Sequence, residues 1–237
     1  MANIIFSGGN AAGSAPPPIS VTSGLCSALL GVVSQQLQDV TGITWDTTAV
    51  LLPYLNMAVK EIANKVPESS PASIDVPLLP GVRQALPPGS IFLIDAEGNI
   101  SIDGSLQSAI RIIAKEVIDS ALPDWRVWPT NDEVLLIARD ERNPFTYYTF
   151  PPQPVATTRR ITLVISSHKP DVTDVSQPFP LPLAYVPAAI NYVIYMALRE
   201  ETTIPGAQAK SAACYQQFMQ DLGIGKNVRA KNDAKGV

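Results

Sequence analysis

Two segments constrain the fold of this chain most strongly, because both must be buried on several sides. The stretch Arg139–Pro152 follows an apolar run and consists of a charged turn closing on Asn143–Pro144 and an aromatic strand. It predicts a β-hairpin that Pro151–Pro152 stops. Further along, Pro187–Glu201 predicts a helix with almost no polar face. Neither segment has a pattern typical of a catalytic site, and together they indicate a subunit of an assembly.

The composition favours a surface that other molecules partly cover. Of the 237 residues, 46% are apolar and 16% are charged, whereas charged residues usually make up about 25%. The net charge of −4 argues against a general nucleic-acid-binding protein. The last twelve residues nevertheless hold Lys226, Arg229, Lys231 and Lys235 against Asp233 alone. This basic tail on an acidic body either contacts phosphate or an acidic partner surface, or is a solvated end.

The N-terminal part of the chain predicts an arm followed by two helices. Residues 1–20 are rich in Gly, Ala, Ser and Pro, which is typical of an extended arm. Within 21–67, apolar spacing predicts one helix from Thr22 to Val40 and a second helix that Asp46 caps. Pro53 removes a backbone donor from the second helix, so it either kinks the helix or marks its start.

The C-terminal part predicts a helical pair within 181–223 and a basic tail at 224–237. The last helix is expected over Gly206–Leu222, with one apolar stripe formed by Ala212, Tyr215, Met219 and Leu222. Two helices, a β-rich middle and two helices predict an α+β fold. In this fold a bundle of two N-terminal and two C-terminal helices carries an inserted antiparallel β domain.

The inserted domain is expected to span 68–180. Residues 69–86 look irregular, and Ile91–Ile94 and Ile100–Ile102 predict a hairpin around the turn Asp95–Asn99. Residues 105–113 fit either a helix or a strand, and we favour a strand followed by a short helix over Ala114–Leu122. Three further strands are expected at Val134–Ala138, Thr146–Phe150 and Ile161–Ser166.

Two segments imitate chemical motifs without matching them. In Ile4–Gly13 the glycines have neither dinucleotide-binding nor P-loop spacing, and the phosphate-binding lysine is missing. Ser166 and Lys169 form an S-x-x-K pattern, but the segment ends a strand instead of forming the helical turn that this motif requires. His168, the single histidine, lies in the same loop. A Ser–His–Asp site would have to use it as the base, but the sequence has no nucleophile elbow to present the serine.

No cofactor or metal is expected, and the chain is interpreted as a protein without enzymatic activity. Cys26 and Cys214 lie among apolar neighbours and are expected to be buried, reduced thiols. One histidine and two distant cysteines do not form a zinc site. Neither a secretory signal nor a membrane-spanning stretch is recognised.

Five segments match the motifs of one family in order and spacing. They are Trp45–Lys60, Val82–Pro88, Leu122–Trp125, Asp140–Pro152 and Leu183–Gly223. The chain thereby resembles the head–tail adaptor (connector, or head-completion) proteins of tailed bacteriophages, in which the second of these segments is a strand. The resemblance covers roughly Gln35 to Gly223. Pro53 and the extended arms at both ends depart from the family pattern.

The resemblance implies a structural virion protein and no reaction. Such adaptors form a homo-oligomeric ring, usually a dodecamer, that docks under the portal protein and extends the DNA channel. A tail or nozzle protein attaches below, and DNA passes through without sequence-specific binding. The implied location is the neck of the virion, at the head–tail junction, after synthesis in the host cytoplasm, and no membrane is involved.

Two groups of residues are expected to contact partners. They are the basic tail residues Lys226, Arg229, Lys231 and Lys235, and Tyr192, Tyr195 and Met196, which we expect to lie against the β domain or a neighbouring subunit. Two alternative functions stay open. The first is another virion ring subunit, such as a tail-completion or tail-tube protein, and the second is a β-rich carbohydrate-binding or enzymatic domain.

Overall fold

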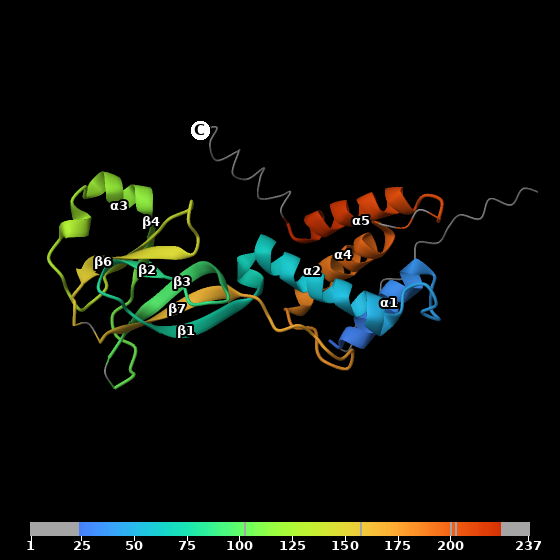
Figure 1. Ribbon diagram of the computed structural model, residues 1–237, viewed down its shortest axis with the longest axis horizontal. Coiled ribbons are helices and arrows are strands. Elements are labelled where there is room, and N and C mark those ends of the chain that lie inside the picture. The colour runs from blue at the N-terminus through green and yellow to red at the C-terminus, as the bar shows by residue number, and fades with distance from the viewer. Residues whose placement is uncertain (1–23, 102, 157, 200, 202, 224–237) are drawn as a thin grey trace, which may run out of the picture.

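A computed structural model of the chain describes residues 24–101, 103–156, 158–199, 201 and 203–223. Four long helices form one lobe and two β-sheets with a short helix form the other (Figure 1). The long helices are α1 (Cys26–Leu37), α2 (Leu52–Lys65), α4 (Val186–Arg199) and α5 (Ala207–Asp221). The predicted α+β class and the two pairs of helices around a β-rich middle are confirmed.

The apolar helix α4 is the centre of the helical lobe. It packs against α1, α2 and α5, which together surround it. Ile190, Val193, Ile194, Ala197 and Leu198 are all buried, as their spacing predicts. The demand of this helix for burial on several sides is therefore met within the chain.

The boundaries of the first two helices agree only partly with the sequence prediction. α1 stops at Leu37, before the predicted Val40, because Gln38 adopts a left-handed conformation with φ 60°. Asp46 caps the next helix as predicted, by accepting hydrogen bonds from the N–H groups of Thr48 and Ala49. A π-helical turn (η1, Thr47–Leu51) precedes α2, so Pro53 lies in the first turn of the regular helix, where its missing donor costs little.

The stripe expected on the last helix is partly wrong. Ala212 is exposed, while Ala207, Ser211 and Phe218 are the buried residues of α5. Small residues at two of these positions let α5 approach α4, and the Ser211 hydroxyl donates to the carbonyl oxygen of Tyr195 at 3.0 Å.

The β lobe is a two-layer sandwich. One sheet has the order β1-β7-β3 and the other has the order β2-β6-β5-β4. The strands are β1 (Pro71–Pro77), β2 (Gly81–Ala85), β3 (Ser90–Ile100), β4 (Arg111–Ala114), β5 (Leu136–Arg139), β6 (Thr146–Gln153) and β7 (Arg160–Ser167). All pairs are antiparallel except β4 and β5, which are parallel, so the predicted antiparallel domain is in fact mixed. The short helix α3 (Lys115–Ala121) provides the crossover that a parallel pair requires.

Two expectations for the β lobe are wrong. The predicted turn Asp95–Asn99 is part of β3, which continues through it and pairs with β7, with register irregularities between Leu93 and Asp95 and between Ala96 and Gly98. Gly98 serves a close approach, because a Cβ there would lie 2.7 Å from the carbonyl oxygen of Ser108. Residues 69–86, predicted to be irregular, contain the strands β1 and β2. The sequence pattern did not predict β1 because a proline stands at each of its ends, which an edge strand tolerates.

The hairpin of β5 and β6 is confirmed, but its predicted end is wrong. β6 continues through Pro151 and Pro152 to Gln153. Pairing with β2 jumps from Tyr148 opposite Arg83 to Gln153 opposite Gly81, so both prolines lie in a register irregularity. Their missing N–H groups therefore cost no regular ladder hydrogen bond there. The strand at β4 followed by helix α3 agrees with the favoured interpretation of residues 105–122.

Three amide side chains fix the segments that connect these elements. Asn56 on α2 accepts from the N–H of Val172 at 2.8 Å and donates to its carbonyl at 2.9 Å. The Asn99 side chain likewise accepts from the N–H of Val134 at 2.9 Å and donates to its carbonyl oxygen at 2.8 Å. The Gln84 side chain accepts from the N–H of Leu79 at 2.8 Å and donates to its carbonyl oxygen at 2.7 Å. We call these three pairs the amide clamps.

The first clamp also helps to cap α1, which has no side-chain cap of its own. It anchors the returning segment after β7, whose carbonyls at Val175 and Gln177 accept from the first N–H groups of α1, those of Ser27 and Cys26. Orphan donors at a helix N-terminus are thereby satisfied by the backbone of a distant segment.

Shortening Ile194 to Ala is expected to lower the free energy of unfolding by about 2–5 kcal/mol, because it leaves a cavity in the core of the helical lobe. Ile194 is 0% exposed. Denaturant unfolding followed by circular dichroism measures the loss. Val155→Ala, at a position 90% exposed, is the control and should change stability by less than about 0.5 kcal/mol. Equal stability of the two variants would contradict this packing.

Candidate interaction surfaces

The residues with chemical potential do not converge in the structure. Ser166 lies inside β7 and is fully buried, while His168 is exposed just beyond the end of that strand. The extended backbone places Ser166 and Lys169 outside the one-turn geometry of an acyl-transfer site. Both cysteines are free thiols; Cys26 is buried as predicted, whereas Cys214 is half-buried. Burial raises the pKa of both thiols, so they are poor nucleophiles. Across the described ranges no three His, Cys, Asp or Glu residues form a metal-binding group.

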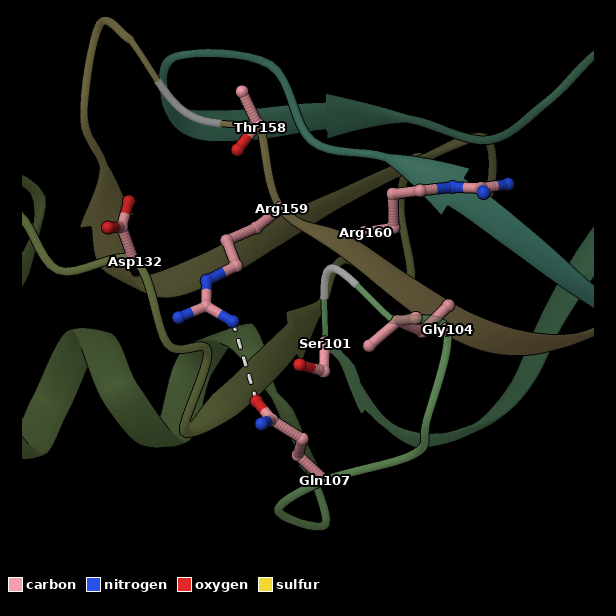
Figure 2. Close-up of a pocket in the computed structure, with 8 residues that line it drawn as sticks. Ser101, Gly104, Gln107, Asp132, Thr158, Arg159 and Arg160 are labelled. Carbon is pink, nitrogen blue, oxygen red and sulfur yellow. Dashed lines mark hydrogen bonds between the residues drawn. The ribbon is translucent and has the colours of Figure 1, made fainter.

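A cavity in the β lobe has a volume of about 570 Å³. Figure 2 shows the Arg159 side chain extending into it, with its Nη1 donating to Gln107 Oε1 at 3.4 Å. Arg160, Asp132 and the hydroxyls of Ser101 and Thr158 also line the space. Figure 2 shows the Arg160 side chain extending away from Arg159 and Asp132, so the charged groups of this lining do not converge and do not select one ligand chemistry.

A more distinctive site is the excursion between β4 and β5, which contains α3 and the short 3₁₀ turn η3 (Trp125–Val127). Two buried residues of the excursion, Ile118 and Trp125, anchor it to the β2-β6-β5-β4 sheet. They pack there with Ala138 of β5 and Phe150 of β6. The Trp125 ring meets Tyr148 edge-on, with ring centroids 6.0 Å apart. Such a contact adds to the burial energy of both rings.

Asp119 ties α3 to η3. Its carboxylate accepts from Lys115 Nζ at 2.7 Å, Trp125 Nε1 at 2.9 Å and Arg126 Nη2 at 2.6 Å. The hydrogen bond from Lys115, followed by those from Trp125 and Arg126, lowers the pKa of Asp119 to about 2. The excursion is thus braced by an apolar anchor on one side and a charged network on the other.

This braced excursion exposes large apolar side chains. Val127 is 82% exposed and Trp128 is 47% exposed, although the Trp128 ring still contacts Phe150 with ring centroids 5.9 Å apart. Val117 and Leu122 are exposed as well. We call Val117, Leu122, Val127 and Trp128 the α3–η3 surface. Exposed apolar groups held on an ordered support indicate an interaction site more strongly than scattered ones do.

A second braced excursion follows α1. Asp39 accepts from the N–H groups of Ile43, Thr44 and Trp45 at 3.1, 2.8 and 2.7 Å. These backbone donors, the one from Trp45 above all, lower the pKa of Asp39. We call residues 39–45 the Asp39 loop. The loop holds Val40 and Ile43 in solvent, at 75% and 87% exposure, at the opposite end of the molecule from α3 (Figure 1).

None of the residues predicted to contact partners belongs to the α3–η3 surface or the Asp39 loop. Tyr192, Tyr195 and Met196 belong to the helical core instead of facing the β domain. The Tyr192 ring meets Phe218 of α5 edge-on, with ring centroids 5.0 Å apart, and the Tyr195 ring packs in a tilted arrangement on Tyr215, with centroids 4.9 Å apart. Contact of these three residues with a neighbouring subunit stays a prediction. Lys226, Arg229, Lys231 and Lys235 lie outside the described residues, as does the arm 1–20.

Sequence reasoning missed both exposed surfaces. The signal for the first was present in the sequence, because Val127 and Trp128 follow the Leu122–Trp125 motif after a single residue, Arg126. Large apolar residues in a segment that is predicted to be a loop can indicate a surface that contacts a partner. The Asp39 loop gave no comparable signal, since Val40 fits the apolar stripe of the preceding helix.

Replacing Asp119 by Asn is expected to remove an acid-dependent part of the stability. The carboxylate has a pKa of about 2 in the folded protein and about 3.9 when unfolded. Its contribution is therefore complete above pH 4 and is lost as the pH falls toward 2. Asp119→Asn should lower the free energy of unfolding at pH 7 by about 1–2 kcal/mol and flatten its pH dependence between 4 and 2. Thermal unfolding of both proteins at several pH values measures this.

The exposed carboxylate of Asp124, in the same excursion, provides the control. Asp124→Asn should keep the pH dependence of the parent protein. An Asp119→Asn variant with unchanged acid sensitivity would show that the carboxylate does not brace the excursion.

Comparison with known proteins gives one family. The family model described as SU10 adaptor protein matches residues 26–235, which is most of the chain. A search of curated proteins finds no match. Among the helices that the structure describes, none has the length and apolar character to cross a membrane. The family match agrees with the adaptor resemblance seen in the five sequence segments, and the chain belongs to the SU10 adaptor protein family.

Proposed function

We propose that this protein is a structural subunit of a tailed-bacteriophage virion. It forms a homo-oligomeric ring, a dodecamer in the simplest case, that docks under the portal at the neck. The ring extends the DNA channel and offers the surface on which a tail or nozzle protein assembles. Its membership of an adaptor family supports this role. The protein is made in the host cytoplasm and has no catalytic function in this proposal.

The observation that carries the proposal is the pair of apolar surfaces at opposite ends of the molecule (Figure 1). The α3–η3 surface lies on the β lobe and the Asp39 loop lies on the helical lobe. A ring subunit needs two different patches for its two neighbours, and an adaptor needs further surfaces above and below the ring. A protein with two distant, non-equivalent contact regions fits this demand better than one with a single cleft.

The subunit is also suited to exist alone before assembly. Its apolar helix α4 is buried by its own neighbours, so the fold does not depend on a partner. Both surfaces are held by hydrogen bonds in the single chain, which lowers the entropy cost of binding. A monomer in solution is therefore compatible with a ring in the virion.

The charge distribution fits a DNA channel. The body is acidic and would repel the phosphate backbone, so the polymer would slide without sticking. The basic residues Lys226, Arg229, Lys231 and Lys235 are then free to contact the portal, an acidic neighbour or the DNA. The portal is our choice among these three.

Charging the two surfaces should weaken assembly. Val127→Asp and Ile43→Asp place a carboxylate at positions 82% and 87% exposed, so both variants should fold normally. Each is expected to reduce attachment to portal-bearing, DNA-filled heads at least tenfold, or about 1.4 kcal/mol. Sedimentation of heads with bound protein measures attachment, and negative-stain images of portal complexes show whether a ring forms.

Val155→Asp, at a position 90% exposed outside both surfaces, is the matched control and should attach like the parent protein. If both charged variants attached as well as this control, neither surface would be an assembly contact. The absence of this protein from virions and portal complexes would contradict the whole proposal.

Deleting Lys226–Val237 tests the role of the basic tail. The melting temperature of the monomer should stay nearly unchanged, whereas attachment to heads should weaken and become less sensitive to salt. Each basic group on an acidic partner contributes up to ~1 kcal/mol, and a ring multiplies the effect by avidity. Binding measured at low and high ionic strength gives the answer, and unimpaired attachment at both would show that the tail is only a solvated end.

A further inference from the structure

A small apolar pocket lies at the end of the helical lobe that carries the Asp39 loop. It has a volume of about 200 Å³. We call it the Trp45 pocket. Its apolar lining comes from the end of α1, the Asp39 loop, the end of α4, the α4–α5 connection and the start of α5: Leu37, Trp45, Leu198, Ile204, Pro205 and Ala207. The pocket is large enough for one or two aliphatic or aromatic side chains.

The pocket is preformed. Trp45 is held from two sides, because its N–H donates to Asp39 at 2.7 Å and its indole Nε1 donates to the Ala197 carbonyl at 3.3 Å. Lys210 at the rim donates to the Gln36 carbonyl at 2.8 Å and ties α5 to the end of α1. Ile204 stays 42% exposed at the edge. An apolar recess with fixed walls gains free energy when an apolar side chain replaces the water in it.

Two segments of the chain outside the described core are long enough to reach the pocket, and their chemistry separates them. The C-terminal tail is basic and would meet the ammonium group of Lys210 at the rim. Residues 1–23 contain no charged side chain, and their longest uninterrupted run of large apolar residues is Ile4-Ile5-Phe6. This run begins the glycine-rich segment that imitates a phosphate loop without matching one, and the proposed function leaves it unexplained.

The length of the connection also fits. The pocket lies at the last residue of α1, and the described chain begins two residues before the first. A helix of 12 residues is about 18 Å long. The connection between Phe6 and Gly24 is rich in Gly, Ala and Ser and includes the run Pro16–Pro18. A flexible linker of this length has a root-mean-square span of about 23 Å, and the proline run extends it further. Effective concentration is highest when linker span and site separation match.

We propose that Ile4-Ile5-Phe6 binds the Trp45 pocket of its own chain. The arm runs back along α1 and places one or more of these side chains between Trp45 and Ile204. The segment thereby fills the pocket beside the Asp39 loop in the free subunit. The argument for this contact does not rest on the adaptor role, because it uses the pocket and the sequence of a single chain.

Photo-cross-linking tests this contact in the full chain. With p-benzoylphenylalanine in place of Phe6, irradiation should link the arm to peptides containing residues 37–45 or 198–210, as mass spectrometry of the digest identifies. Mixing unlabelled and ¹⁵N-labelled protein before irradiation separates the two possible sources of the arm. We expect cross-linked peptides in which both partners carry the same isotope, at a yield independent of protein concentration.

Two controls make the result specific. Ile204→Asp should lower the cross-link yield at least fivefold, because the charge at the rim disfavours an apolar occupant. Val155→Asp should leave the yield unchanged, and circular dichroism of both variants checks that they fold. The photo-reactive residue in place of Ile19 should not mark the pocket.

Three results would overturn the proposal. Mixed-isotope cross-links would assign the pocket to the arm of a neighbouring copy. Cross-links spread over the whole surface would show that the arm has no site. Cross-links to the pocket that survive Ile204→Asp undiminished would show that proximity, and not apolar binding, produces them. None of these results would bear on attachment of the protein to heads.

Discussion

The fold depends on a small set of side-chain amides that replace regular backbone pairing. The Asn56 amide makes two hydrogen bonds to Val172, at 2.8 and 2.9 Å, and so fixes the segment that returns from the β lobe. The Asn99 amide fixes the approach to β5 through Val134. Buried backbone groups need partners, and proline-rich connections lack the neighbours that a sheet or helix would supply. Each amide clamp satisfies one donor and one acceptor at once.

These clamps explain how a chain with little charge and many prolines presents ordered surfaces. The segment ending at Val134 closes the excursion that carries the α3–η3 surface, and Asp119 braces it from within. Asp39 does the same for the loop that exposes Val40 and Ile43. An exposed apolar group on a flexible loop must be ordered when it binds, at a cost in entropy. Preformed loops avoid most of that cost, which suits a subunit that binds several neighbours.

The sequence predicted the elements whose burial is local in origin and missed those that distant contacts decide. The helix α4 and its buried Ile194 follow from apolar periodicity. The turn expected at Asp95–Asn99 was wrong because pairing with β7 outweighed local turn chemistry. The prolines that bound β1 concealed an edge strand. The motif residues Asn56 and Gln84 were visible, but their role as clamps was not, since the partners Val172 and Leu79 follow only from the fold. The α3–η3 surface had a signal in the apolar residues Val127 and Trp128 that follow a motif, whereas the exposure of Val40 could not be predicted because this residue continues the apolar stripe of the preceding helix.

Backbone hydrogen exchange of the free monomer tests most directly whether the contact surfaces are preformed. The account predicts slow exchange at the amides of Val134, Val172, Thr44 and Trp45, whose N–H groups donate to Asn99, Asn56 and Asp39. Protection there should approach that of the helical core before any partner is added. Asn56→Ala should speed exchange at Val172 and at the Cys26 and Ser27 amides that the returning segment caps, while Val134, Thr44 and Trp45 stay protected. Exchange at the rate of an unfolded peptide in the monomer, with protection only after assembly, would contradict the account.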